Sequence, residues 1–134
     1  MENELEVLFA REGLRLTSAR KEVFKLLYRS EAPLSIATIA KSLNGIDRVS
    51  VYRTIELFQT LSIVNPVPLG WKQLYELTSP FKAHHHHLSC TKCGKLTDVH
   101  SKKFEQLVAS VAREHNFTPQ DHTFEIKGLC SDCS

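Results

Sequence analysis

Cysteine is absent from the first 89 residues of this 134-residue chain, and all four cysteines follow that point. No apolar run approaches the roughly 20 residues that span a bilayer. The N-terminal residues 1–4 are acidic, and no apolar core of a secretory signal follows them. These absences argue against a membrane protein and against an exported disulfide scaffold. A cytoplasmic location is therefore expected.

Motifs for catalysis are also missing. The chain has no Gly-rich phosphate loop and no His-Glu-x-x-His helix. An enzyme would have to use the histidine run at residues 84–87 as a hydrolytic zinc site with an open position. Such a site needs a pocket that a chain of this size scarcely provides, so no enzyme is expected.

Positive charge is concentrated near the N-terminus, although the net charge is only +2. Between Arg11 and Arg53 there are nine Lys or Arg residues against four Asp or Glu. An excess of this kind suits contact with phosphates. Solvated helix faces often carry a similar excess, so this signal alone leaves both interpretations open.

The first 78 residues are predicted to form short helices followed by a hairpin. Thr17 and Ser35 stand where N-caps belong, and Gly70 stands between two extended segments. The predicted helices are 3–12, 17–29, 35–43 and 47–61, and the predicted strands are 63–69 and 73–78. This order is that of a winged helix-turn-helix.

The remainder of the chain is predicted to form a smaller ββαβ unit. Its strands are placed at 84–90, 95–99 and 124–129, and its helix carries an apolar stripe: Phe104, Leu107, Val108, Val111 and Ala112. A unit of this size is hard to stabilise alone. The predicted class is α+β, with a winged-helix DNA-binding domain at 1–79, a hinge at 80–83, and an α/β dimerisation and metal-binding domain at 84–134.

The cysteines form two Cys-x-x-Cys pairs, Cys90 with Cys93 and Cys130 with Cys133. Two such pairs supply a closed tetrahedral Zn(Cys)₄ site, which leaves no position for substrate and is therefore structural. The predicted zinc joins the start of this domain to its end. A redox dithiol and two disulfides are the alternatives.

Four consecutive histidines, residues 84–87, lie in a segment that is predicted to be a strand. A purification tag is disfavoured because the run is internal, and incidental surface histidines are the other alternative. Side chains alternate between the faces of a strand, so His84 and His86 would point one way and His85 and His87 the other. Each pair needs partners from elsewhere, and the candidates are Glu76, Asp98, Glu105, His100, His115 and His122. Such ligands suit Fe(II), Mn(II) or Zn(II).

Four motifs in order resemble those of the ferric uptake regulator family of metal-dependent repressors. Residues 13–20, Gly-Leu-Arg-Leu-Thr-Ser-Ala-Arg, are similar to the family's G-x-x-x-T-x-x-R. Residues 50–54, Ser-Val-Tyr-Arg-Thr, are similar to its T-V-Y-R recognition helix, with Ser50 in place of Thr. Residues 84–95 are similar to H-H-x-H-L-x-C-x-x-C-G-K, and residues 128–133 to G-x-C-x-x-C.

This resemblance implies a homodimer that a metal corepressor closes onto an A/T-rich palindrome in double-stranded DNA. Tyr52 and Arg53 match positions that meet bases and phosphates in the major groove, beside Ser50. Arg15 matches a position that reaches the backbone or minor groove, and Arg20 one near phosphate. An intramolecular ion pair is the alternative for Arg20 and Arg53.

The resemblance also assigns the two metal sites. The regulatory site, which bridges the two domains, matches Glu76, His85, His87 and Asp98. The second site matches His84, His86, Glu105 and His122. Many relatives have a regulatory histidine where this chain has Pro33, which argues against the peroxide-sensing branch. Zinc-sensing relatives often have a cysteine in the regulatory site, and here all four cysteines are committed to the structural zinc. An all-His cluster also occurs among zinc sensors, so iron or manganese is favoured as the metal sensed, with zinc as the next candidate.

Three hypotheses therefore stand beside one another: a metal-dependent repressor, a metal-storage or metal-delivery protein that does not bind DNA, and a small zinc hydrolase. The recognition-helix match favours the first of them.

Overall fold

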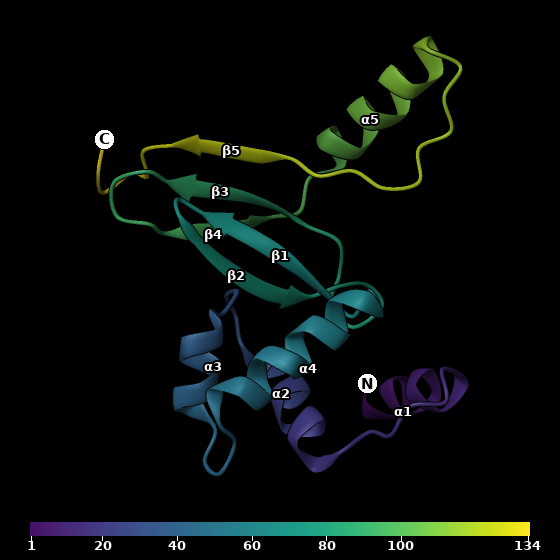
Figure 1. Ribbon diagram of the computed structural model, residues 1–134. Coiled ribbons are helices and arrows are strands. Elements are labelled where there is room, and N and C mark those ends of the chain that lie inside the picture. Colours follow the sequence, from purple (N-terminus) through teal and green to yellow (C-terminus); the bar gives the residue numbers. More distant parts are fainter. The chain divides into compact units, whose positions relative to one another are not determined.

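The computed structural model describes residues 1–134, and it divides into two compact units, 1–83 and 84–134 (Figure 1). The first unit holds four helices and a hairpin: α1 (Glu2–Arg11), α2 (Ser18–Arg29), α3 (Ile36–Ser42), α4 (Arg48–Thr60), β1 (Val64–Leu69) and β2 (Lys72–Leu77). The second holds β3 (His86–Cys90), β4 (Leu96–Val99), α5 (Lys102–Glu114) and β5 (Glu125–Gly128). This order of elements confirms the predicted α+β class.

Side-chain caps fix where the helices of the first unit begin. Thr17 accepts a hydrogen bond from the backbone N–H of Arg20 at 3.3 Å and caps α2. Ser35 caps α3 in the same way, through the N–H of Thr38. Each cap satisfies a backbone donor that has no partner within its helix. The sequence therefore located these two helix starts correctly.

Aromatic rings from α1, α2 and α4 pack in the core of the first unit, among aliphatic side chains that include Ile39 of α3. Phe9 of α1 meets Phe58 of α4 edge to face, with ring centroids 6.2 Å apart. Phe81 is buried, and its ring lies 5.1 Å from that of Phe24 on α2. Residues 80–83, predicted as a hinge, therefore pack with the first unit because Phe81 is part of its core.

The hairpin of the first unit consists of two paired strands, and one residue of the segment before α3 pairs with the second of them. β1 and β2 pair antiparallel from Val64↔Leu77 to Leu69↔Lys72. Leu34 forms an additional antiparallel bridge to Tyr75 on the other side of β2. β1 is thus an edge strand, a position that tolerates prolines such as Pro66 and Pro68.

In the second unit β3 is the central strand of a three-stranded sheet with the order β4-β3-β5. It pairs antiparallel with β4 and parallel with β5. β3 begins at His86, so His84 and His85 precede the strand that was predicted to start at residue 84. Because β3 and β5 run in the same direction, the segments that follow them leave the sheet at the same edge.

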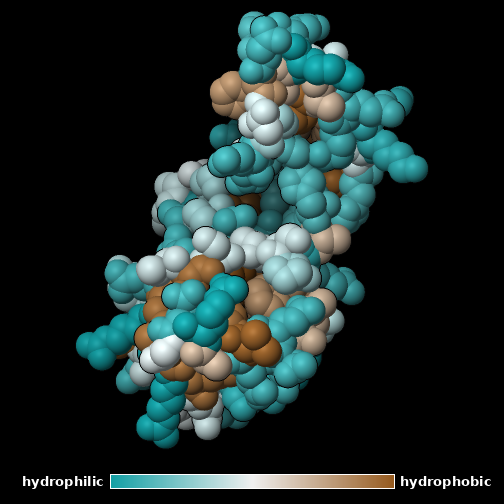
Figure 2. All heavy atoms as spheres, turned by 90° about the vertical axis from the view of Figure 1, so that its right-hand side faces the viewer, coloured by the Kyte–Doolittle hydropathy of each residue, from teal (hydrophilic) through white to brown (hydrophobic).

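The apolar stripe of α5 is largely exposed. Leu107 is 52% exposed and Val111 46%, whereas Ala112 is the stripe's one buried member. Figure 2 shows brown, hydrophobic residues at the surface among hydrophilic ones. The three-stranded sheet of one chain therefore leaves much of this helix face uncovered. No helix combines the length and apolar character needed to cross a membrane.

Phe58 provides a test of the first unit's core. Its side chain is fully buried, so Phe58→Ala should lower the free energy of unfolding by about 3–5 kcal/mol, through lost burial and a residual cavity. Val49→Ala, at a 57% exposed position of the same helix, should change it by less than about 0.5 kcal/mol. Urea unfolding monitored by helical circular dichroism measures both, and equal losses would contradict this packing.

Candidate metal sites and nucleic-acid interface

The parallel pairing of β3 with β5 brings the two cysteine pairs together. Cys90 ends β3 and lies opposite Gly128, the last residue of β5. Each strand is followed directly by a tight turn, in which Gly94 N–H donates to the Cys90 carbonyl and Cys133 N–H to the Cys130 carbonyl. Gly94 has a φ of +77°, a conformation that glycine adopts without strain. Two distant segments therefore present their thiols to one point.

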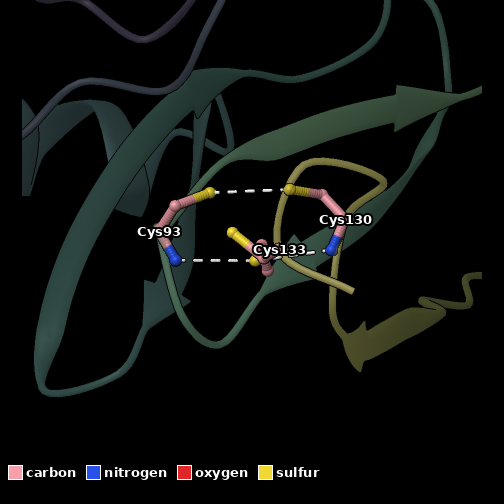
Figure 3. A group of neighbouring side chains, drawn as sticks. Cys93, Cys130 and Cys133 are labelled. Atoms are coloured by element: carbon pink, nitrogen blue, oxygen red, sulfur yellow. Dashed lines mark hydrogen bonds between the residues drawn. The ribbon is translucent and has the colours of Figure 1, made fainter.

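The geometry of the four sulfurs fits a tetrahedral zinc ion. Their Sγ atoms all lie within 4.8 Å of one another, and none forms a disulfide. Figure 3 shows Cys93, Cys130 and Cys133 with their thiols gathered in one place. The Cys93 and Cys130 sulfurs are 3.8 Å apart. Zn–S bonds of about 2.3 Å in a tetrahedron separate neighbouring sulfurs by about 3.8 Å. The cluster thus has the dimensions of a closed zinc site.

Backbone hydrogen bonds prepare one of these thiols for metal binding. The N–H of Cys93 points at the Cys90 sulfur from 3.5 Å, and that of Cys130 from 3.4 Å. These donors stabilise the thiolate and lower the pKa of Cys90 to about 6. The hydrogen bond with Cys130 raises the pKa of Cys133 to about 12. Zinc binding must therefore release a proton from Cys133, and it weakens as pH falls.

The second cluster gathers His84, His86, Glu105 and His122 around one carboxylate. Glu105 of α5 lies 2.9 Å from Nε2 of His86 and 2.8 Å from Nε2 of His122. Nε2 of His84 is 3.2 Å from the same carboxylate. The hydrogen bond from His86, followed by that from His122, holds the pKa of Glu105 below its usual value. Three imidazoles and a carboxylate can bind a divalent metal such as Zn(II), Mn(II) or Fe(II).

His86 is the most constrained member of the second cluster. It is 3% exposed, and the backbone N–H of Phe124 donates to its Nδ1 at 3.2 Å. In the neutral ring the Nε2 proton then points at Glu105. A metal at Nε2 would require the ring proton to move to Nδ1, and the hydrogen bond from the Phe124 N–H would then be lost.

The other two histidines of the run meet Asp98 on β4. Nε2 of His87 is 3.5 Å from Oδ1 of Asp98, its register partner across the sheet, and Nε2 of His85 is 3.8 Å from the same oxygen. The two rings are perpendicular with centroids 4.8 Å apart. His100 lies nearby, its ring 5.8 Å from that of His85. The structure thus sorts the four histidines into the two alternate pairs that the sequence predicted.

Glu76, the remaining residue predicted for the regulatory site, lies on β2 of the first unit. It is 8% exposed, and Nζ of Lys82 lies 3.4 Å from its carboxylate. The sequence did not predict the ion pair of Lys82 with Glu76, because no helical or strand period links the two residues. Their proximity depends on the turn at 78–82, where the N–H groups of Phe81 and Lys82 donate to the Thr78 carbonyl.

The N-terminal end of α4 exposes the residues predicted to meet DNA. Asp47 caps the helix by accepting from the N–H of Ser50 at 2.7 Å, and this hydrogen bond lowers the pKa of Asp47. Val51, Ile55 and Phe58 turn into the core. Tyr52 is 55% exposed, and Arg48 and Arg53 are also exposed. The helix therefore presents a basic and aromatic outer face at its start.

Arg20 is engaged within the chain. Its guanidinium donates to the backbone carbonyl of Arg15 and lies 5.9 Å from the ring centre of Phe9. Arg15 itself is exposed. The contacts of Arg20 hold the segment before α2 in place. Arg15, by contrast, is accessible to a ligand.

Comparisons with known proteins agree with one another. The model of the ferric uptake regulator family matches residues 11–127. The ferric uptake regulation protein of Campylobacter jejuni is 31% identical over 129 residues, which are 91% of this chain and 81% of that protein.

Solved structures give the same result. The ferric uptake regulator Fur of Helicobacter pylori, described with three functional metal binding sites, matches with a TM-score of 0.84 at 24% identity, covering 98% of this chain and 89% of that chain. A zinc-bound manganese uptake regulator matches with a TM-score of 0.69 at 30% identity, covering 94% and 98%.

The four-sulfur cluster yields a direct test. Cys90→Ser or Cys133→Ser should remove the zinc and destabilise the second unit, because the binding energy of a structural site is folding energy. Metal analysis after native purification and thermal unfolding measure the two effects. Ser131→Ala, inside the same turn, is the control and should retain a full zinc equivalent. A Cys90→Ser protein with full zinc and unchanged stability would rule out the four-sulfur site.

Proposed function

The chain belongs to the ferric uptake regulator family of metal-sensing transcription regulators, and we propose that it is a metal-dependent DNA-binding repressor of metal-homeostasis genes. In this proposal a dimer binds an A/T-rich palindrome when its regulatory sites hold metal. The four-cysteine cluster holds a structural zinc. The regulatory metal is Fe(II) or Mn(II), with Zn(II) as the next candidate.

The observation that supports this function best is the division of the histidine run. His84 and His86 meet Glu105, whereas His85 and His87 meet Asp98. A storage protein needs only to bind metal ions, and a single cluster of ligands is sufficient for that. Two separate ligand sets from four consecutive residues suit a protein in which one metal stabilises the fold and another regulates it.

The proposed regulatory site consists of His85, His87 and Asp98 in the second unit and Glu76 in the first. A divalent metal ion bound here would attract all four of these ligands, which are two imidazoles and two carboxylates. Ligands from both units make the metal-bound form favour one arrangement of the units, which shifts the population toward the DNA-competent dimer. Pro33 contributes no ligand, so this chain relies on these four residues or on water to complete the coordination.

The exposed face of α5 supports the dimer. Leu107 and Val111 of α5 are exposed, and Phe117, which follows the helix, is 70% exposed, so one chain leaves this apolar surface uncovered. Ile126 on β5 is 50% exposed as well. A second copy that covers this surface would bury the stripe that the sequence pattern marks as core. The second metal site, through Glu105 on the same helix, would then stabilise the dimerisation domain.

DNA retardation separates the repressor from a storage protein and from a hydrolase. The probe is a duplex selected from a random-sequence library by the manganese-loaded protein. Retardation should require Mn(II), Fe(II) or Zn(II) in the buffer and should disappear with a chelator that leaves the structural zinc in place. Metal uptake without retardation under any of the three metals would favour storage.

The two histidine pairs should differ in what their loss does. His85→Ala and His87→Ala should abolish metal-activated DNA binding and leave the dimer intact, because they belong to the proposed regulatory site. His84→Ala and His86→Ala should chiefly lower thermal stability or dimerisation. Gel retardation beside size-exclusion chromatography measures both properties. Equal loss of activation from all four variants would count against two separate sites.

The outer face of α4 should read the DNA. Arg53→Ala, if Arg53 clamps phosphate, should weaken all sequences about equally and lower the salt slope by about one unit per site. Tyr52→Ala should cost roughly 1–3 kcal/mol and relax the preference at one base pair. Glu56→Ala, on the same helix, is a control that should retain affinity. Titrations with metal present over a series of salt concentrations measure these effects. Full operator affinity in the Tyr52→Ala, Arg53→Ala double variant at any one salt concentration would refute this role.

A further inference from the structure

Glu76 is a nearly buried carboxylate that already has a cation beside it. Nζ of Lys82 lies 3.4 Å from Oε2 of Glu76, and the two side chains are 26% and 10% exposed. Burying a carboxylate without a cation or hydrogen bonds is costly, and Lys82 offsets part of that cost. The proposed function assigns this same carboxylate to a divalent metal, so the two cations would compete for it.

The first unit holds the backbone of Lys82 in place. The N–H groups of Phe81 and Lys82 both donate to the Thr78 carbonyl. The hydroxyl of Thr78 donates in turn to the Ser62 carbonyl at 2.6 Å. The buried Phe81 ring packs against that of Phe24. The backbone of Lys82 is therefore anchored, and its side chain is the part that is left to move.

Lys82 is also the one Lys or Arg between Lys72 and Lys92. The segment between those two lysines contains Glu76, the histidine run and the first cysteine, which are all ligand types for divalent metals. A positive charge inside such a segment opposes the binding of cations. Its position against Glu76 makes this opposition specific to one ligand.

An ammonium group and a divalent metal repel each other strongly at one carboxylate. Metal–carboxylate bonds are about 2.0–2.2 Å long, so a metal on Oε2 would lie within about 5.6 Å of Nζ in its present position. Water screens this repulsion only weakly where the groups are partly buried. The ammonium has three donors and no acceptor, so it cannot become a ligand itself. It has to leave the carboxylate when the metal binds.

We propose that Lys82 is a built-in competitor for Glu76 and sets the metal concentration at which the regulatory site fills. This proposal rests on the proposed function and deepens it. Without metal, Lys82 pairs with Glu76; with metal, its ammonium turns toward solvent, which the 26% exposure of the side chain allows. Because the repulsion depends on charge, Lys82 weakens the binding of all divalent metals alike. It sets the threshold and not the choice of metal.

Removing the charge should strengthen metal binding, whereas removing a ligand weakens it. Lys82→Met keeps the length of the side chain without its charge. Protein that retains its structural zinc is titrated with Mn(II) and, separately, with Co(II), against a competing chelator and without DNA. Lys82→Met should bind both metals roughly tenfold more tightly, and Lys82→Arg, which keeps the charge, should bind like the wild type. Lys72→Met, at an exposed position of β2, is the matched control and should change nothing.

Glu76→Gln assigns the effect to the regulatory site. The second cluster also offers metal ligands, but Glu76 is not among them. In the Glu76→Gln background, Lys82→Met should change the affinity by about twofold at most, because the competition acts through this carboxylate. A tenfold gain that persists in this background would overturn the proposal. With Glu76 intact, the Mn(II) concentration for half-maximal retardation of the selected duplex should fall by the same factor as the affinity rises.

The outcomes separate this proposal from the function on which it rests. Wild-type protein that binds no metal beyond the structural zinc would refute both. Metal-dependent retardation with unchanged metal affinity in Lys82→Met would make the ion pair purely structural and overturn the competitor role alone. Weaker binding would also overturn it, because Lys82 would then support Glu76 as a ligand, and so would a gain for one metal only. Thermal unfolding verifies that the variants are folded, and Lys82→Gln, neutral and polar, replaces Lys82→Met if that variant is not.

Discussion

The parallel pairing of β3 with β5 is the constraint on which the second unit depends. It places Cys90 opposite Gly128, so that two Cys-x-x-Cys turns 36 residues apart leave the sheet together. The apolar contacts of this unit are few, because its sheet has three strands and its helix exposes much of its stripe. A zinc ion at the four sulfurs would cross-link the first strand of the unit to its last residues and thereby close the sheet.

β3 also explains how one short segment serves two ligand sets. A zinc ion at the four cysteines would fix its cysteine end, and strand pairing fixes its histidine end, since His86 and His87 lie opposite Val99 and Asp98. The alternation of side chains then directs His86 to Glu105 of α5 on one face of the sheet and His87 to the Asp98 side chain of β4 on the other, and His84 and His85 before the strand follow the same division. A slip of one residue in the register would exchange the two pairs and separate each from its carboxylate. The cysteine cluster and the histidine groups are therefore parts of one arrangement, in which a zinc ion at the first would hold the register for the second.

Much of this arrangement could be predicted from local patterns, and the exceptions have physical reasons. Thr17 and Ser35 mark helix starts because capping is a local interaction. The division of the histidines followed from the alternation of side chains along an extended segment, so it required only the prediction that residues 84–90 are extended. By contrast, the periodicity of α5 records which of its faces is apolar and not what covers that face. The contact between Phe81 and Phe24, and the ion pair of Lys82 with Glu76, join residues that no sequence period connects, so the association of 80–83 with the first unit was missed.

The Lys82–Glu76 pair bears on how a regulatory metal would act. A carboxylate that is 8% exposed needs a cation or hydrogen bonds, and Lys82 supplies a positive charge at 3.4 Å. In the proposed mechanism the metal takes this carboxylate, so it has to replace an attraction that the chain already provides. Its affinity is then the difference between the two interactions and not the full strength of metal–carboxylate binding. Such a balance suits a sensor, because a site that bound metal with full strength would be occupied at every cellular concentration and could not report a change.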